Sequence, residues 1–322
     1  MSLGFWEKLK YPILEMAPMC GVTDLPFRLI CHQYGADVVC TEMIMVQALS
    51  RHDKKSIAMA RVDDAERPVM IQLGGKDPEQ YYKSAKIVQE LGADGIDINF
   101  GCPAKKVVGS GGGVSLLRNL DLCREIVQAT VEGAGNLPVS IKTRKHIKDK
   151  KGNIITSIDL INKLQGLPIA SVMIHGRTYE APWTQEVDYN YIAEVRKVWP
   201  GILLANGGIY EPEIAKTALE ITGANGLGIA HGVYGRPWIF NQIKELLKIG
   251  KYQQPTWAEK KQIALEHARL AFKLKGPHGI IELRKQLVWY VKGLENATDY
   301  RKNLVNVTTL DQVEEALNSI ND

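Results

Sequence analysis

The chain has 322 residues, of which 45% are hydrophobic and 24% charged, with 40 Lys and Arg against 36 Asp and Glu. This length and composition exclude a small scaffold stapled by disulfides or metal, and they exclude a disordered chain. They predict one large domain, or one large domain with a small companion. The formal net charge of +4 is too small to indicate nucleic-acid binding by itself.

The five cysteines include no Cys-x-x-Cys pair, so they indicate neither a disulfide framework nor a zinc ribbon. We expect a reducing compartment and no metal site. No segment approaches the ~18 apolar residues of a membrane span, and the N-terminus lacks a basic segment followed by a long apolar run. We therefore expect a soluble, cytoplasmic protein that is neither exported nor membrane-spanning.

Short apolar segments rich in β-branched residues recur along the first 240 residues. They predict eight strands at 13–18, 36–43, 68–74, 95–101, 138–143, 171–176, 201–208 and 226–230. Stretches with helical periodicity lie between them, for example at 78–92, 120–133, 189–199 and 211–223. This alternation predicts an α/β fold, a parallel (β/α)8 TIM barrel. A doubly wound open sheet is the rival fold, but no GxGxxG follows the first strand.

After residue 240 the strand signal disappears and several helical stretches follow, which predict a small helical bundle. We divide the chain into a barrel at 1–240 and a C-terminal helical domain at 241–322. Residues 241–302 hold thirteen Lys and Arg against six Asp and Glu, a balance of +7, whereas residues 1–240 hold 27 against 26. Such a bias is typical of a polyanion site and equally of a solvated helical surface.

Polar residues stand where the predicted strands end, which is where barrel enzymes place their catalytic groups. Cys102 follows the fourth strand, and the two lysines after it, Lys105 and Lys106, favour a thiolate or attract an anion. The other strand ends supply Gln72, Lys142, His175 with Arg177, and Asn206 with Gly207 and Gly208. Each of these residues has a structural explanation when taken alone. Their joint placement at the ends of four strands indicates a site.

The glycines at the end of the seventh strand suggest the ligand. Gly207 and Gly208, with the backbone of 230–232 after the eighth strand, occupy the usual phosphate-binding corner of such barrels. A phosphorylated cofactor is expected there. Lys142 beside the pyrimidine end of a flavin and Gln72 at its polar edge fit FMN better than pyridoxal phosphate. Lys142 alone equally suggests a Schiff base.

Several segments match a known family, and they appear in the family's order. They are APMCGVTDLPFR (17–28), EM (42–43), IQLGG (71–75), DINFGCPAKKV (97–107), IKTR (141–144), IHGRT (174–178), ANGGI (205–209) and YGRPWIF (234–240). By these motifs the chain resembles the tRNA-dihydrouridine synthases, and most of all their bacterial B-type branch. DINFGCPAKKV together with HGRT and GRPWIF is a specific signal. The helical region that follows resembles the family's RNA-binding bundle.

The resemblance implies an FMN enzyme that reduces the C5–C6 double bond of a tRNA uridine to 5,6-dihydrouridine, with NADPH or NADH as reductant. It implies that Cys102 is the general acid that protonates C5, while flavin N5 delivers hydride to C6. We expect the enzyme to act as a monomer. The positions that match cofactor contacts are Pro18, Met19, Cys20, Gln72, Lys142, His175, Asn206, Gly207 and Gly208.

Access to a buried flavin requires the target base to leave the tRNA stack. Basic side chains at the barrel rim would then hold flanking phosphates, and the basic helices would bind the tRNA body. We expect substrate contacts from Asn99, Lys105, Lys106, Arg177, Arg284 and Lys285.

The chain departs from the family pattern at the phosphate site. The family usually has Gly-Arg after the eighth strand, with the arginine on the FMN phosphate, whereas this chain has Ala230 and His231. Histidine brings less charge and no bidentate fork, so weaker or pH-dependent FMN binding is expected. A second departure is the run at 142–151, which carries six basic side chains and one acidic one. It suits RNA binding and a solvated hairpin equally well.

Two other functions stay open at this point. One is a small-molecule FMN reductase of the dihydroorotate dehydrogenase kind, against which the basic helical segment argues. The other is an RNA-binding relative without flavin chemistry, which the altered phosphate site and the glycine-rich run at 109–113 suggest. The retained set of Cys102, Gln72, Lys142 and His175 argues against this second possibility, because a binding module has no evident need for it.

Overall fold

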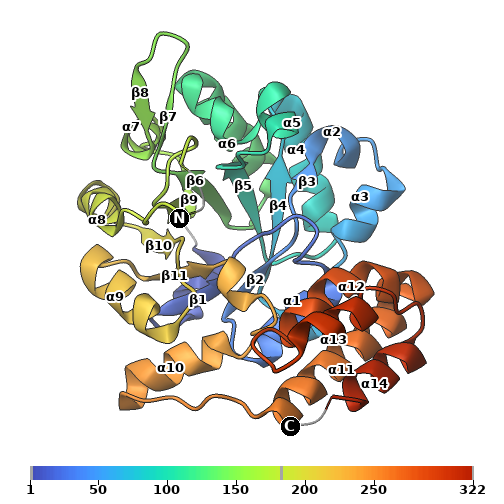
Figure 1. Ribbon diagram of the computed structural model, residues 1–322. Coiled ribbons are helices and arrows are strands. Elements are labelled where there is room, and N and C mark those ends of the chain that lie inside the picture. Colours follow the sequence, from blue (N-terminus) through green and yellow to red (C-terminus); the bar gives the residue numbers. More distant parts are fainter. Residues whose placement is uncertain (1–2, 182–183, 321–322) are drawn as a thin grey trace.

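The computed structural model describes residues 3–181 and 184–320, and its centre is a closed barrel (Figure 1). Within these residues eight parallel strands form the barrel: β1 (Ile13–Met16), β2 (Val38–Cys40), β4 (Val69–Gly74), β5 (Gly95–Phe100), β6 (Val139–Arg144), β9 (Ile169–His175), β10 (Ile202–Asn206) and β11 (Gly226–Ile229). Pairing of β2 with β4 closes the circle. Each predicted strand segment overlaps one of these strands, and the predicted TIM barrel is confirmed.

The strands form from segments in which apolar residues predominate on both faces. Every residue of β4, β5 and β9 is buried, as expected of parallel strands that are filled on the inside and covered by helices on the outside. The covering helices are α1 (Leu25–Gln33), α2 (Val46–Leu49), α3 (Lys54–Met59), α4 (Pro78–Glu90), α5 (Lys105–Gly109), α6 (Leu120–Ala134), α7 (Ser157–Lys163), α8 (Tyr189–Val198), α9 (Pro212–Thr222) and α10 (Ile239–Ile249). Short polar side chains start several of them. The Asp77 side chain, for example, accepts from the first backbone N–H groups of α4.

Short elements interrupt the regular alternation. Strand β3 (Ile44–Met45) extends the sheet beside the end of β4. Strands β7 (His146–Lys148) and β8 (Ile154–Thr156) form an antiparallel hairpin directly after β6, and β7 lies within the basic run of the sequence. The 3-10 turns are η1 (Gly4–Lys8), η2 (Asp64–Glu66), η3 (Gly113–Arg118) and η4 (His231–Val233). The hairpin projects from the barrel on the side away from the C-terminal helices (Figure 1).

The chain ends in a group of helices beside α1: α11 (Trp257–Lys275), α12 (Pro277–Tyr290), α13 (Ala297–Leu304) and α14 (Leu310–Asn318). These helices share an apolar cluster of their own, to which α1 contributes Ile30. Helix α10 belongs with the barrel, because Ile239, Phe240 and Ile243 pack into the barrel cluster. The division of the chain at residue 240 stays a prediction.

Helix α1 connects the barrel to the C-terminal helices. Its Phe27 ring stacks on His267 of α11, with ring centroids 5.2 Å apart. The Lys275 ammonium at the end of α11 lies 2.6 Å from Asp24, the residue that caps α1. The helical region is therefore held against one side of the barrel, close to the loops that follow the strands.

Two further results for the described residues concern membrane spans and metal sites. None of the helices in this part of the chain is long and apolar enough to cross a membrane. Nowhere between residues 3 and 181 or between 184 and 320 do three His, Cys, Asp or Glu side chains gather as they would around a metal ion.

Candidate active site

A cavity of about 240 Å³ opens at the carboxyl ends of the barrel strands, and we call it the mouth cavity. The segments after β1, β2, β5 and β11 and the C-terminal halves of β4, β5, β6, β9 and β10 form its walls. Its lining residues are Pro18, Met19, Cys20, Met43, Gln72, Asn99, Gly101, Cys102, Pro103, Lys142, Arg144, His175, Asn206, Ala230, His231 and Tyr234. The structure thus brings together residues that the sequence analysis selected from seven separate segments.

Cys102 lies at this mouth, two residues beyond β5, and its side chain is partly exposed. Its backbone N–H donates to Asn99 Oδ1 at 2.8 Å, which turns the chain sharply after the strand. The carbonyl before it, on Gly101, accepts from Arg144 Nε at 2.7 Å. Gly113 packs against the other side, where a Cβ would lie 2.5 Å from the Cys102 carbonyl oxygen. The backbone of Cys102 is therefore held in place by its own loop and by two neighbouring segments, β6 and η3.

A chain of hydrogen bonds leads from the barrel interior to this loop. Gln72 Nε2 donates to Asp97 Oδ2 at 2.7 Å, and Asn99 Nδ2 donates to Gln72 Oε1 at 2.9 Å. Asn99 Oδ1 is then left to accept from the backbone of Cys102. Because a carboxylate only accepts, Asp97 in its ionised form sets the orientation of both amides. Burial raises the pKa of Asp97 to about 7, while the Gln72 hydrogen bond and the Lys142 charge lower it.

Lys142 stands on the wall of the mouth cavity next to Asn99, with which it is paired in register between β5 and β6. Its ammonium donates to Asn206 Oδ1 at 3.0 Å. Burial and the nearby Arg144 charge lower the pKa of Lys142 to about 8, against the opposing effect of Asp97 and Glu15. Burial, followed by the charge of Asp97, raises the pKa of Glu15 well above its usual range. Lys142 is therefore cationic at neutral pH.

His175 is held neutral at the end of β9. Burial, followed by the charges of Arg144 and Lys142, keeps the pKa of His175 far below its usual value. Its Nε2 is buried and has no hydrogen-bond partner among the residues that the structure describes. Burial and the charge of Arg177 also lower the pKa of His231. The mouth cavity thus combines fixed positive charge with a neutral imidazole whose polar atom is available to a ligand.

Beside the mouth cavity lies a cradle of backbone formed by Gly207 and Gly208 after β10, with Ala230 and His231 after β11. Both glycines have positive φ, +111° and +71°, and a Cβ on Gly207 would lie 2.5 Å from His175 Cδ2. Only glycine therefore fits there without displacing the imidazole. Arg177 also lines the cradle and is 7% exposed, with its Nε donating to Gln185 O at 2.6 Å. The sequence predicts Arg177 at the rim, as an RNA contact, whereas the structure buries its side chain beside the cradle.

The remaining residues expected to contact substrate lie apart from one another. Lys105 and Lys106 are exposed in the first turn of α5, just beyond the Cys102 loop. Lys285 of α12 extends over the barrel rim, with its ammonium nitrogen 3.4 Å from where a Cβ on Gly21 would lie. Arg284 of the same helix turns inward, and its Nε donates to the carbonyl of Val307.

Seven residues at or below the mouth cavity were not selected from the sequence. Five of them lie inside the matched segments but carry no distinctive spacing: Met43, Gly101, Pro103, Arg144 and Tyr234. Glu15 and Asp97 lie within apolar strands, where a lone acidic residue gives a weak signal. The alternation of Asp97 with Asn99 on β5 was the available indication, because residues i and i+2 point to the same face of a strand.

Comparison with known proteins identifies the family. A family model described as dihydrouridine synthase matches residues 15–322 of the chain. The chain belongs to the dihydrouridine synthase family. A probable tRNA-dihydrouridine synthase of Rickettsia conorii is 37% identical over 298 residues, covering 90% of this chain and 88% of the relative. The tRNA-dihydrouridine synthase B of Pseudomonas syringae is 36% identical over 291 residues, covering 89% of this chain and 85% of the relative.

Among solved structures, this dihydrouridine synthase family member resembles barrel enzymes of low sequence identity. Morphinone reductase matches with a TM-score of 0.52 and 14% identity, over 81% of this chain and 91% of that one. Histamine dehydrogenase from Rhizobium matches with a TM-score of 0.55 and 13% identity, over 80% of this chain and 48% of that one. These likenesses concern the fold alone and agree with the barrel described above.

Membership of the dihydrouridine synthase family confirms that the chain is an oxidoreductase enzyme, and it confirms the resemblance read from the motifs. It also implies a flavin as cofactor and a tRNA as substrate.

Proposed function

We propose that this enzyme binds FMN and reduces the C5–C6 double bond of a tRNA uridine to 5,6-dihydrouridine, with NADPH as the source of electrons and Cys102 as the general acid. The observation that carries the proposal is the position of the Cys102 side chain on the same cavity as Lys142 and His175, next to the glycine cradle. An acid, a cation and a phosphate site are thereby adjacent.

The residues present fit a flavin that carries a phosphate. Gly207, Gly208 and Arg177 would hold the phosphate, since the cradle offers backbone room and a guanidinium beside it. Arg177 would supply the charge that His231 lacks in comparison with arginine. Lys142 would balance negative charge on the pyrimidine end of the ring, and the unpartnered Nε2 of His175 would gain a hydrogen bond. When bound, the reduced flavin supplies hydride to C6 of uracil.

Cys102 would supply the proton that completes the reduction. Its thiol holds a proton and transfers it to C5, while Asn99 and Arg144 keep the loop in place through the backbone on either side of the residue. Uracil enters the mouth cavity only after it has left the base stack, because the cavity lies within the ring of loops. The second N–H of the Asn99 amide, beyond the one donated to Gln72, would donate to the entering base.

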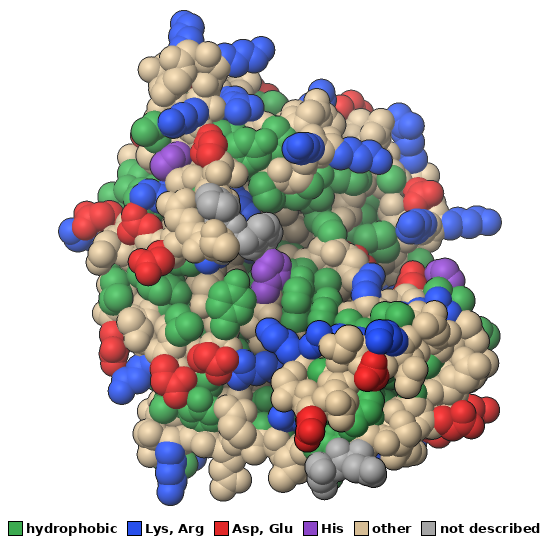
Figure 2. All heavy atoms as spheres, in the orientation of Figure 1, with side chains coloured by type: hydrophobic (Ala, Val, Ile, Leu, Met, Phe, Trp, Pro, Cys, Tyr) green, Lys and Arg blue, Asp and Glu red, His purple; other side chains and the backbone are tan. Residues whose placement is uncertain are grey.

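The RNA would lie across the face that carries the mouth cavity. Figure 2 shows Lys and Arg side chains gathered along the boundary between the barrel and the C-terminal helices, and again at the tip of the hairpin. We propose that Lys105, Lys106 and Lys285 contact phosphates near the target, that Arg284 supports the helical surface at 241–322, and that a single chain suffices for binding.

The test begins with the purified protein. We expect flavin absorbance in the visible range, FMN on release of the cofactor, and dihydrouridine formed in tRNA from a synthase-deficient strain when NADPH is added. Cys102→Ala should keep flavin content and tRNA affinity but lower turnover by about 100-fold or more, the usual scale for a general acid. Cys102→Ser, which keeps the size but holds a far less acidic proton, should also be slow.

Each outcome separates the alternatives. Turnover unchanged in Cys102→Ala would refute the acid role. Protein that carries flavin and consumes NADPH, but leaves tRNA unreduced, would instead be a small-molecule reductase. Protein that binds tRNA without flavin would be an RNA-binding relative.

A further inference from the structure

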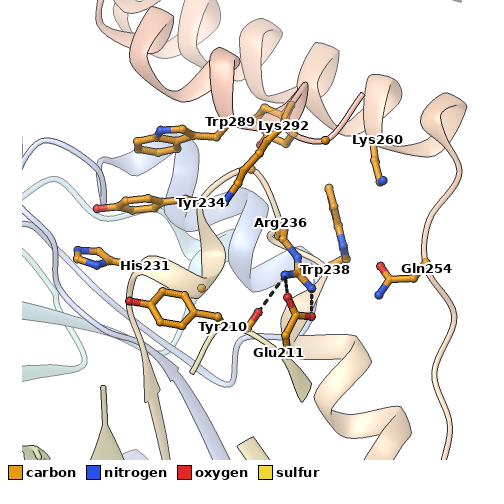
Figure 3. A pocket seen from close by; sticks show the side chains of 14 residues that line it. Tyr210, Glu211, His231, Tyr234, Arg236, Trp238, Gln254, Lys260, Trp289 and Lys292 are labelled. Carbon is orange, nitrogen blue, oxygen red and sulfur yellow. Dashed lines mark hydrogen bonds and ion pairs between the residues drawn. The ribbon is translucent and has the colours of Figure 1, made fainter. Parts of the chain in front are cut away.

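A second and larger cavity, of about 710 Å³, opens between the barrel and the C-terminal helices (Figure 3). We call it the ladder pocket. Its barrel wall comes from the segments after β10 and β11, and its other wall comes from α11, α12 and the turn after α12. Its volume is in the range of sites that enclose a ligand of nucleotide size, about 300 to 1,000 Å³.

A ladder of aromatic rings forms one side of this pocket. The rings of Trp289 and Tyr234 are stacked, with centroids 4.0 Å apart and planes within 6°. The His231 ring follows, 4.9 Å from Tyr234, and Tyr210 lies beyond it (Figure 3). His231 and Tyr234 line the mouth cavity as well. The ladder is therefore a wall shared by the ladder pocket and the candidate active site.

The charges of the ladder pocket favour an anion. Arg236 is neutralised by Glu211, whose two carboxylate oxygens lie 2.6 and 2.9 Å from its guanidinium nitrogens. Lys260 of α11 and Lys292 after α12 extend into the pocket from the helical side (Figure 3). Neither lysine forms an ion pair within the described part of the chain. Lys292 shares the charge of Glu211 with Arg236, so the three basic side chains face a single carboxylate and the pocket keeps a positive charge next to the stacked rings.

We propose that the ladder pocket binds an unstacked nucleotide of the substrate RNA close to the target uridine, with its base on the face of the Trp289 ring that Tyr234 does not cover and its phosphate at Lys260 and Lys292. This inference rests on the proposed function. Removal of a uridine from its stack leaves neighbouring bases without partners, and single-stranded RNA is recognised by stacking such bases on aromatic side chains. The shared ring wall puts this nucleotide beside the base that reacts.

The pocket also lies on the boundary where basic side chains gather, and one of its walls belongs to the basic helical segment. These features favour the RNA over the nicotinamide reductant as occupant. The nicotinamide ring of the reductant must reach the flavin in the mouth cavity. The experiment therefore has to distinguish RNA binding in the ladder pocket from entry of the reductant through that pocket.

The experiment measures the two half-reactions of the FMN-loaded, full-length enzyme. Flavin reduction is followed on mixing with NADPH, and flavin reoxidation is followed on mixing the reduced enzyme with increasing concentrations of tRNA. Trp289→Ala should raise the tRNA concentration for half-maximal reoxidation about tenfold, as expected when one base stack is removed, with flavin reduction unchanged. Trp289→Phe should restore most of the affinity. Tyr82→Ala, at an exposed tyrosine of α4, is the matched control and should behave as wild type.

The lysines provide a test that keeps the aromatic packing intact. Lys260→Gln with Lys292→Gln should weaken tRNA binding and lower the slope of log Kd against log salt by about 0.7 for each phosphate that is no longer neutralised. Slower flavin reduction by NADPH with normal tRNA kinetics would assign the ladder pocket to the reductant and overturn the proposal. No change in either half-reaction would show that it takes no part. Failure of the proposed function itself would appear separately, as wild-type enzyme that tRNA does not reoxidise.

Discussion

Asp97 is the buried end of the hydrogen-bond chain that leads through Gln72 and Asn99 to the backbone of Cys102. Asp97→Asn keeps the size of the side chain but offers an amide that donates as readily as it accepts. The Gln72 and Asn99 amides then lose their fixed orientation. Misplacement of the Cys102 loop by about 1 Å should lower turnover on the order of 100-fold, with the KM for tRNA unchanged.

The matched control for this variant is Asp64→Asn, at an exposed carboxylate of η2. It should have wild-type kinetics. Normal turnover in Asp97→Asn would mean that Asn99 positions the Cys102 loop without the hydrogen bonds through Gln72 to Asp97.

The charge of Lys142 gives the reaction a pH dependence. With a pKa of about 8, the amine is protonated below that pH and neutral above it. In the proposed complex the Lys142 charge would lie beside the pyrimidine end of the flavin and would favour flavin reduction. The rate of flavin reduction should therefore fall as the pH rises through about 8. Lys142→Arg keeps its charge and should abolish this fall. The test is the rate of flavin reduction by NADPH, measured between about pH 7 and pH 9 in both proteins. A wild-type rate that does not change over this range would contradict the prediction.

At this scale the sequence predicted the residues at strand ends better than those within strands. Cys102, Lys142 and His175 were found because each interrupts or ends an apolar run, and a barrel brings all strand ends to one face. Asp97 and Glu15 were not found, since their importance depends on side chains from neighbouring strands. Arg177 was assigned to the rim because nothing in its position along the chain shows that it turns toward the glycine cradle.

The elements that hold the loops can be tested through their glycines. Gly113 in η3 has φ +59°, and an added Cβ would lie 2.5 Å from the carbonyl oxygen of Cys102. Gly113→Ala should therefore displace the Cys102 loop and lower turnover while flavin content stays normal. Gly166→Ala introduces a similar backbone strain, at φ +83°, but with nothing within 4 Å. It should cost only about 1 to 2 kcal/mol of stability and leave turnover intact.

A buried ion pair fixes the start of α1. Arg28 donates to Glu66 at 2.6 and 2.9 Å, and the two side chains are 1% and 0% exposed. Arg28→Ala leaves the Glu66 carboxylate buried without its partner and should lower the free energy of unfolding by about 3 to 5 kcal/mol. Arg67→Ala removes more exposed ion pairs and should cost less than about 1 kcal/mol. Urea unfolding followed by circular dichroism compares them.

Among the elements, the barrel strands were predictable because their apolar runs are separated by helical periodicity. The hairpin of β7 and β8 was not predicted as strands, since its Lys-rich sequence has the composition of a loop. Its pairing arises from position, because β6 delivers the chain to solvent and the turn at 149–153 brings it back. The packing of helix α10 onto the barrel could not be predicted from the sequence either, because it depends on contact with the neighbouring helix α9.

For the whole molecule, the near-neutral net charge conceals a basic face. Lys285 reaches from α12 to the barrel rim and so stands where RNA would cross between the two parts. Lys285→Gln should weaken tRNA binding and lower the slope of log Kd against log salt by about 0.7 to 0.9. Lys216→Gln, on the exposed surface of α9, is the control and should leave the slope unchanged. Equal slopes for both variants would show that Lys285 does not contact the RNA.

The stacked rings of Trp289, Tyr234 and His231 join the helical region to the loop that borders the phosphate cradle. Anything bound on one side that shifts these rings alters the binding free energy on the other. Thermodynamic linkage makes such an effect reciprocal, so the factor by which RNA changes the affinity for the flavin equals the factor by which the flavin changes the affinity for RNA. In the proposed complex, this stack of three rings would couple retention of the cofactor to capture of the substrate.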